Sequence, residues 1–175
     1  MSPGPDPIAL IQPVVPALRR YARALLRDRD DADDLVQDVL ERAISRIHQR
    51  RADASIRAWL FAIVHNLAMD RLRQRNRRGP ADPIESVPEA HLSAPAQQEA
   101  AIARKDILSL IASLPAEQSS VLLLVGVEEL SYADAALVLD IPVGTVMSRL
   151  SRGRDRLRRL MNDGSNARTS FRIVS

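Results

Sequence analysis

Apolar side chains recur at helical spacing along the first half of the chain. Residues 14–47 are helix-forming sequence. The apolar positions in this stretch are Leu18, Leu25, Leu35, Val39 and Ile47. After a polar stretch, Ser55 can cap a long helix that ends near Arg77. Spacings of four, three and four residues separate Ile56, Leu60, Ile63 and Leu67 in that helix. Such spacing predicts one buried face.

The helical pattern stops after Arg78 and resumes near residue 99. Residues 79–97 contain four prolines and one glycine but few bulky apolar groups, so they cannot build a core and indicate a linker. Beyond it the pattern predicts helices up to Leu114, over residues 117–127, over 131–140 and over 143–161. Ser131 and Asp134 form a capping-box pattern, and Ile141-Pro142 predicts a turn.

No stretch alternates as a strand does, so the expected fold class is all-α. We expect two small helical domains joined by a flexible linker. The expected boundaries are an N-terminal extension (1–13), a first domain (14–78), the linker (79–98), a second domain (99–162) and a loosely held tail (163–175).

Composition narrows the class of protein. With 46% hydrophobic and 27% charged residues among 175, the chain has the composition of a soluble globular protein. No apolar run is long enough to span a bilayer, and the N-terminus lacks the basic region of a secretory signal, which predicts a cytoplasmic protein. Cysteine is absent and the three histidines are far apart, so we expect no metal, no cofactor and no enzymatic activity.

Charge is unevenly distributed although the net charge is only +3. All but one of the 25 cations are arginines, whose planar fork suits phosphates and guanine edges. A GC-rich genome would also enrich arginine, but it would not place the arginines in two clusters. One cluster lies in residues 149–159 and the other in residues 71–78, whereas residues 28–41 are strongly acidic.

The arginine cluster at residues 149–159 lies in a helix-turn-helix pattern, in which a short capped helix, a tight turn and a longer basic helix follow one another. The apolar stripe of the longer helix comprises Val146, Leu150, Gly153, Leu157 and Leu160. A helical wheel places on the other side Met147, Ser148, Ser151, Arg152, Asp155 and Arg159, where DNA could be met. Taken alone, this helix could equally be a solvated surface helix.

The second cluster follows Trp59, Phe61, His65 and Asn66, a combination that suits unpaired bases. Alternatively, the two aromatic residues are core residues and the arginines interact with the helix C-terminus. For Trp59 we favour the core and for Asn66 a functional role. The acidic block would repel phosphate, so it is either a solvated face or a protein-docking surface.

Together these stretches resemble the extracytoplasmic-function (ECF) sigma factors, the smallest members of the sigma-70 family of bacterial transcription initiation factors. Residues 30–43 resemble the family's polymerase-binding helix, 55–78 its promoter-melting and -10 recognition segment, and 114–161 its -35 recognition domain. The intervening linker is similar in length and character to the family's connector. Four stretches in the family's order make the resemblance specific.

The resemblance implies roles for individual residues. The positions that match the helix docking on the clamp of the largest polymerase subunit are Asp31, Asp34, Leu35, Gln37 and Asp38. Asn66 matches a position in the pocket for a flipped base, with the loop around residues 48–54, and promoter-backbone contacts match Arg71, Arg73 and Arg75. The -35 recognition face matches Met147, Ser148, Ser151 and Arg152, with Thr145 and Arg149 at phosphate-contact positions. Met147 replaces the usual lysine or arginine, and Asp140 replaces a frequent turn glycine.

The implied partners are core RNA polymerase, through its clamp and flap, double-stranded and melted promoter DNA, and an anti-sigma factor. Membrane contact is expected only through a membrane-bound anti-sigma factor. Two alternatives remain. A helix-turn-helix regulator would leave the acidic block and residues 59–78 without a task, and a sigma-mimicking module that sequesters an anti-sigma factor would not need a basic recognition helix.

Overall fold

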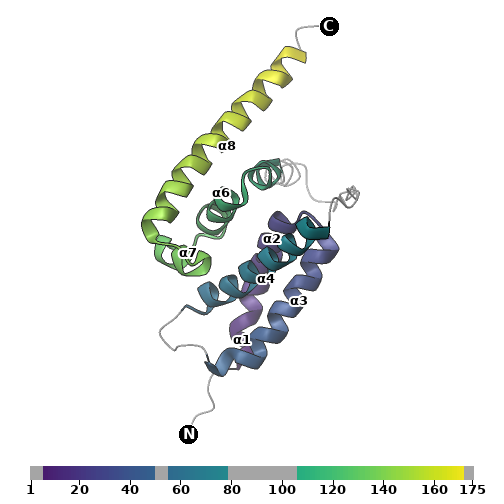
Figure 1. The fold of residues 1–175 in the computed structure, drawn as a ribbon, viewed down its shortest axis with the longest axis vertical. Coiled ribbons are helices and arrows are strands. Elements are labelled where there is room, and N and C mark those ends of the chain that lie inside the picture. Colours follow the sequence, from purple (N-terminus) through teal and green to yellow (C-terminus); the bar gives the residue numbers. More distant parts are fainter. Residues whose placement is uncertain (1–5, 50–54, 79–105, 172–175) are drawn as a thin grey trace.

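The computed structural model describes residues 6–49, 55–78 and 106–171 (Figure 1). Within these ranges every regular element is a helix and no strand occurs, so the all-α prediction is confirmed. The predicted linker and the loop at residues 50–54 lie outside the described residues.

The first unit consists of α1 (Pro7–Ile11), the 3-10 turn η1 (Gln12–Val14), α2 (Val15–Leu26), α3 (Arg29–Arg46), the 3-10 turn η2 (Ile47–Gln49) and α4 (Ile56–Arg78). The helical stretch predicted over residues 14–47 is interrupted at Arg27, whose left-handed backbone (φ 56°) ends α2. Asp28 then caps α3, because its carboxylate accepts the Asp31 N–H at 2.9 Å. Helical structure begins before residue 14, and Ile11 is already buried.

The core of the first unit lies where α2, α3 and α4 meet. Tyr21 and Phe61 are fully buried and pack edge to face, with ring centroids 5.4 Å apart. The predicted N-cap of α4 is present, since the Ala58 N–H donates to Ser55 Oγ at 3.3 Å. The predicted buried face of α4 is partly wrong. Leu60 is buried, but the helix is rotated so that Phe61, Val64 and Ala68 complete its buried side, while Ile56, Ile63 and Leu67 are only half-buried.

The second unit comprises a helical segment at residues 106–112, α6 (Ala116–Val121), the π-helical turn η3 (Leu122–Val127), α7 (Tyr132–Leu139) and α8 (Val143–Phe171). The single helix predicted over 117–127 therefore changes from α-helical to π-helical after Val121. Glu129 follows with a left-handed backbone (φ 55°) and turns the chain toward α7. Helix α8 continues through ten residues past its predicted end at Met161, so that the expected loosely held tail is helical as far as Phe171.

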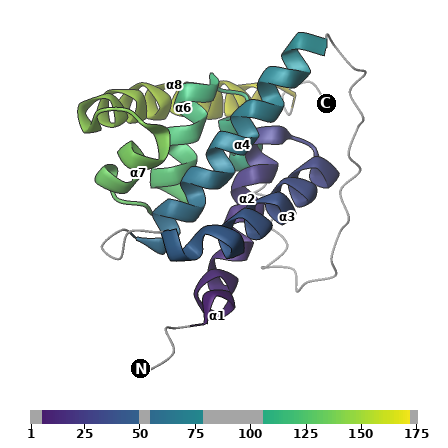
Figure 2. The same ribbon diagram turned by 60° about the horizontal axis from the view of Figure 1, so that its bottom comes forward.

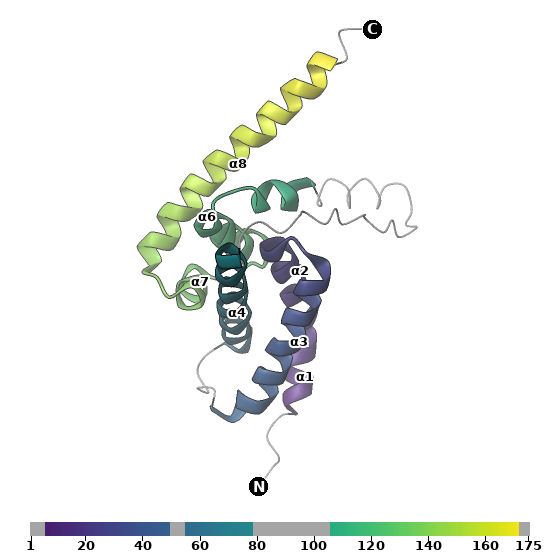
Figure 3. The same cartoon turned by 45° about the vertical axis from the view of Figure 1, so that its right-hand side comes forward.

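The two units pack against each other. Helix α7 lies along α4, and α6 contacts α2, as the views in Figures 2 and 3 agree. The buried apolar side chains of both units form one continuous cluster. The two domains predicted on either side of a linker are therefore in direct contact.

Candidate nucleic-acid interface

Helices α7 and α8 form the predicted helix-turn-helix. Ser131 caps α7, since its Oγ accepts the Asp134 N–H at 3.0 Å. The capping box is modified, because the Asp134 carboxylate accepts from the Ser131 hydroxyl at 2.9 Å. Asp140 ends α7 with a left-handed backbone (φ 52°), the conformation that a turn glycine would adopt. Short polar side chains tolerate this region better than most, so the helix-turn-helix forms without the glycine.

The inner face of α8 matches the predicted stripe. Val146 and Leu150 are buried, and Leu157 and Leu160 are half-buried. Gly153 is buried against α6 and the turn after it, where a Cβ would lie 3.0 Å from Leu122 Cδ1. This close approach fixes which side of α8 faces away from the protein.

The outer face of α8 carries the predicted recognition residues. Met147 is 53% exposed, and Ser151 and Arg152 are also exposed. Thr145 and Ser148 are half-buried, and the Ser148 hydroxyl donates to the Thr145 carbonyl at 3.1 Å. The exposed set offers a guanidinium, a hydroxyl and a thioether, which can contact base edges in a major groove.

Arg149 lies at the edge of this face and is already paired. Its Nη2 lies 3.0 Å from Glu117 Oε2 on α6. Because the Glu117 side chain is 69% exposed, the pair is well hydrated and easily exchanged for a phosphate.

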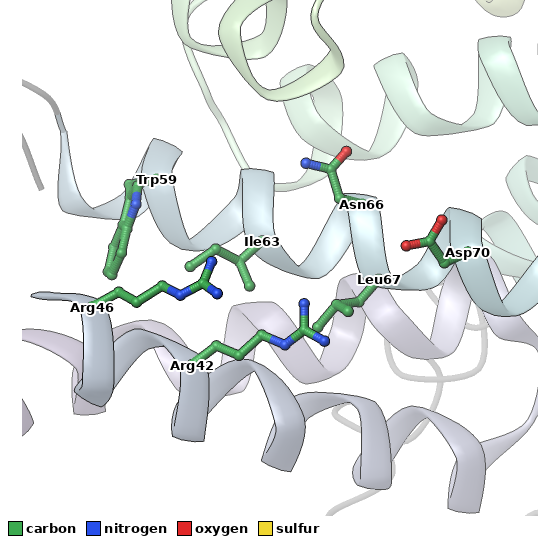
Figure 4. A pocket seen from close by; sticks show the side chains of 7 residues that line it. All are labelled: Arg42, Arg46, Trp59, Ile63, Asn66, Leu67 and Asp70. Carbon is green, nitrogen blue, oxygen red and sulfur yellow. The ribbon is translucent and has the colours of Figure 1, made fainter. Parts of the chain in front are cut away.

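The first unit has a pocket of about 320 Å³ between α3 and α4, a volume at the lower end for small-ligand sites. It is lined by Arg42, Arg46, Trp59, Ile63, Asn66, Leu67 and Asp70. In Figure 4 the two arginines extend from α3 toward α4 and Trp59 stands beside Arg46, while the Asn66 amide projects from α4 on the side away from the arginines. An indole, an amide and two guanidinium groups can stack on a base, hydrogen-bond its edge and hold its phosphates.

Trp59 is half-buried, so it both packs against the core and lines the pocket. Sequence reasoning missed Arg42 and Arg46. Their i, i+4 spacing on α3 was a usable signal, because it puts both on one side of the helix.

Two arginines near the end of α4, Arg71 and Arg75, are held by the acidic block of α3. Arg71 donates to the Asp31 carbonyl at 2.7 Å, to the Asp31 carboxylate and to Asp38 Oδ2 at 2.6 Å. Burial lowers the pKa of Arg71, but these hydrogen bonds outweigh it and leave the pKa above its ordinary value. Arg75 donates to Asp31 Oδ2 at 2.7 Å and to the Leu26 carbonyl at 3.0 Å. Arg73 pairs with Asp70 on its own helix at 2.6 Å and with no carboxylate of α3 in the part of the chain that the structure describes.

The structure separates the five acidic-helix residues into three kinds. Asp34 and Gln37 are exposed on the outer side of α3. Asp31 and Asp38 are engaged with the α4 arginines, although the Asp38 side chain is still 51% exposed. Leu35 is fully buried in the core of its own unit. Only Asp34, Gln37 and part of Asp38 therefore offer a surface to a partner.

No group of potential metal ligands occurs in the part of the chain that the structure describes. In the same residues, no helix combines the length and apolar character needed to cross a bilayer.

Two family models match the chain, one for each unit. The model described as "Sigma2 domain of PhyR" matches residues 11–65, and the model described as "Sigma-70, region 4" matches residues 104–157.

Curated relatives and solved structures match across both units. The ECF RNA polymerase sigma factor EcfG of Rhodopseudomonas palustris (strain TIE-1) is 37% identical over 147 residues, or 84% of this chain and 80% of that protein. SigM of Mycobacterium tuberculosis (strain H37Rv), also an ECF sigma factor, is 40% identical over 155 residues, or 86% and 76%.

The sigma factor RpoE of Bartonella quintana, solved in complex with the anti-sigma factor NepR, is 31% identical with a TM-score of 0.72 over 87% of this chain and 94% of that one. CnrH, solved with the cytosolic domain of CnrY, is 27% identical with a TM-score of 0.66 over 89% and 86%. With its two helical units, its helix-turn-helix and these relatives, this chain belongs to the ECF sigma factors.

Proposed function

We propose that this protein binds core RNA polymerase and directs it to promoters by contacting a -10 and a -35 element with its first and second units. One observation carries the proposal: a single chain presents both a pocket suited to an unpaired base and an exposed recognition helix suited to duplex DNA. A helix-turn-helix regulator would need only the recognition helix and not the pocket for an unpaired base.

Core polymerase would bind the outer side of α3, where Asp34 and Gln37 are exposed and Asp38 is partly exposed. Carboxylates there suit a basic partner such as the clamp of the largest polymerase subunit, where they would supply register and a fast on-rate. Leu35 supports this surface from beneath, as a core residue that fixes the helix. Asp31 supports it by holding α4 against α3.

The -10 element would be bound at the α3–α4 pocket. Asn66 and Trp59 suit an unpaired base, and Arg42 and Arg46 suit the neighbouring phosphates. Of the three α4 arginines at positions that match promoter-backbone contacts, Arg73 is the most available, because its pair with Asp70 joins two well-exposed side chains. Arg71 and Arg75 could reach promoter phosphates only by exchanging their carboxylate partners.

The -35 element would be read by the outer face of α8. Arg152 is placed to fork onto a guanine, with Ser151, Ser148 and Met147 beside it. Thr145 and Arg149 lie where phosphates would pass, and Met147 offers only an apolar contact at a position where the family usually has a cation.

Control by an anti-sigma factor is supported by the relatives solved with NepR and CnrY, whose similarity spans both units of this chain. We place the protein in the cytoplasm, where core polymerase and promoters are found, and propose that it is not an enzyme: the polymerase performs the chemistry.

The test is run-off transcription from a pool of genomic promoter fragments with sigma-free core polymerase. Wild-type protein should yield specific transcripts. Asp34→Arg should abolish them by weakening polymerase binding, with Asp34→Asn intermediate. Arg152→Ala should abolish them at promoters with a -35 element. Arg19→Ala, which removes the same charge from an exposed position of α2 outside both proposed DNA sites, is the matched control and should leave the transcripts intact. No protein-dependent transcript from active components would refute the proposal.

A further inference from the structure

A buried carboxylate joins the two units. The Glu128 side chain is 1% exposed and follows the π-helical turn of the second unit. It accepts two hydrogen bonds from Arg20 on α2, Nε to Oε1 at 2.7 Å and Nη2 to Oε2 at 2.6 Å. Arg57 on α4 donates from Nη2 to the Glu128 carbonyl at 2.9 Å and lies 3.4 Å from Oε2. Glu128, Arg20 and Arg57, here termed the Glu128 cluster, thus connect two helices of the first unit to the entrance of the helix-turn-helix.

The backbone holds Glu128 in a defined position. Its N–H donates to the Leu123 carbonyl at 2.8 Å, and the Leu130 N–H donates to the Leu124 carbonyl at 2.9 Å. Glu129, between them, has the left-handed backbone that non-glycine residues rarely adopt. The carboxylate is therefore presented to the two arginines by a fixed turn.

The hydrogen bonds of the Glu128 cluster can form only while the two units are in contact. A buried carboxylate without partners is strongly disfavoured, so Glu128 depends on cations that come from the other unit. Arg20 and Arg57 depend on it less, since each side chain is 40% exposed and can be hydrated. Other contacts between the units lie close by, since α2 also packs against α6.

The closed arrangement is too small to bind both promoter elements. Elements at -10 and -35 are centred about 25 base pairs apart, which is roughly 85 Å of duplex at 3.4 Å per base pair. A compact chain of 175 residues has a diameter of roughly 40 Å. Although α8 projects from the body in Figure 1, its recognition residues lie in its first turns, beside α7.

We propose that the Glu128 cluster is a latch that holds the free protein closed and must open before both promoter elements can be bound at once. The need to open rests on the proposed function. The latch itself concerns only the free protein, and it can be tested without polymerase or DNA.

The test measures the distance between the units. Because the chain has no cysteine, Glu41→Cys on α3 and Met161→Cys on α8 provide two exposed sites for spin labels. The labelled protein should show one short, narrow distance distribution by pulsed electron resonance. Adding Glu128→Gln should raise the long-distance population roughly tenfold relative to the short one, as expected for the loss of one charge-assisted hydrogen bond.

The matched control is Glu129→Gln, which makes the same charge change one residue along at an exposed position and should leave the distribution unchanged. The double variant Arg20→Ala, Arg57→Ala leaves the second unit intact and should open the protein at least as far as Glu128→Gln. It can therefore replace Glu128→Gln in the test if Glu128→Gln folds poorly. A wild-type distribution that is already broad, or distances that neither cluster variant changes, would overturn the latch. Absence of transcripts in the run-off assay would overturn the proposed function instead.

Discussion

His65 is a half-buried base whose protonation opposes folding. Burial, with a smaller contribution from the charge of Arg73, lowers its pKa from 6.5 to about 4, and the Tyr21 hydroxyl lies 2.9 Å from its Nδ1. Because the folded pKa is the lower one, the unfolded chain takes up the proton first as the pH falls. The stability due to neutral His65 is therefore complete above pH 6.5 and is lost progressively between pH 6.5 and 4, by about 3 kcal/mol in all.

Urea unfolding at pH 7, 6 and 5 checks this prediction. Wild-type protein should lose stability over this range, and His65→Gln should lose clearly less. His48→Gln, which changes an exposed histidine, should behave as wild type does. Equal pH dependence in the wild type and His65→Gln would contradict the assignment.

The match to the family motif did not separate neighbouring residues of α3 by role. Leu35 and Asp34 both match the polymerase-binding motif, yet one is buried and the other exposed. Periodicity alone could have assigned Leu35 to the core, since it lies on the same helical face as Val39. The pairing of Asp31 with Arg71 joins positions 40 residues apart, and such contacts have no local signal.

At the scale of the helix, Gly153 allows α8 to pack closely. A Cβ there would lie 3.0 Å from Leu122 Cδ1 and 3.2 Å from Cγ, whereas at Gly144 of the same helix it would meet nothing within 4 Å. Gly153→Val should therefore destabilise the protein by about 1–3 kcal/mol through overpacking. Gly144→Val should be close to neutral. Chemical denaturation of both variants measures the difference, and equal stabilities would show that Leu122 moves aside freely.

The ion pairs between α3 and α4 distinguish Asp31, which stabilises the fold, from Asp34, which is proposed to bind polymerase. Asp31 accepts from both Arg71 and Arg75, so Asp31→Asn should lower the free energy of unfolding by about 1–2 kcal/mol. The exposed Asp34 supports no such contact in the described structure, and Asp34→Asn should leave stability unchanged while weakening polymerase binding. The pair is compared by urea unfolding and by titration with core polymerase. A larger loss of stability in Asp34→Asn would reverse the assignment.

The types and most boundaries of the helices were predictable, because caps and periodicity are local. Ser55 and Ser131 mark the starts of α4 and α7 as expected. The break at Arg27 was missed even though Asp28 is a good N-cap, since the apolar pattern continues across it. The π-helical turn after Val121 had no sequence signal, because the run VLLLV suits any tightly buried helix.

At the scale of the whole molecule, the sequence indicated two modules and left their contact unforeseen. A proline-rich segment between two helical units suggests independence. The contact includes the pairing of Glu128 with Arg20 and Arg57, which lie 108 and 71 residues away in the sequence. Sequence patterns report which faces are apolar but not which face of one unit covers another.

This contact should make the two units unfold together. They share one cluster of buried side chains and the Glu128 cluster, so calorimetry of the wild type should show one two-state transition, with equal calorimetric and van't Hoff enthalpies. Glu128→Lys places a third cation against two arginines, which should separate the units and split the transition in two. Glu129→Lys, at an exposed position, should retain one transition. If Glu128→Lys also unfolds in one transition at the wild-type temperature, the units do not depend on this carboxylate. Two transitions in the wild type would mean that each unit is stable without the other.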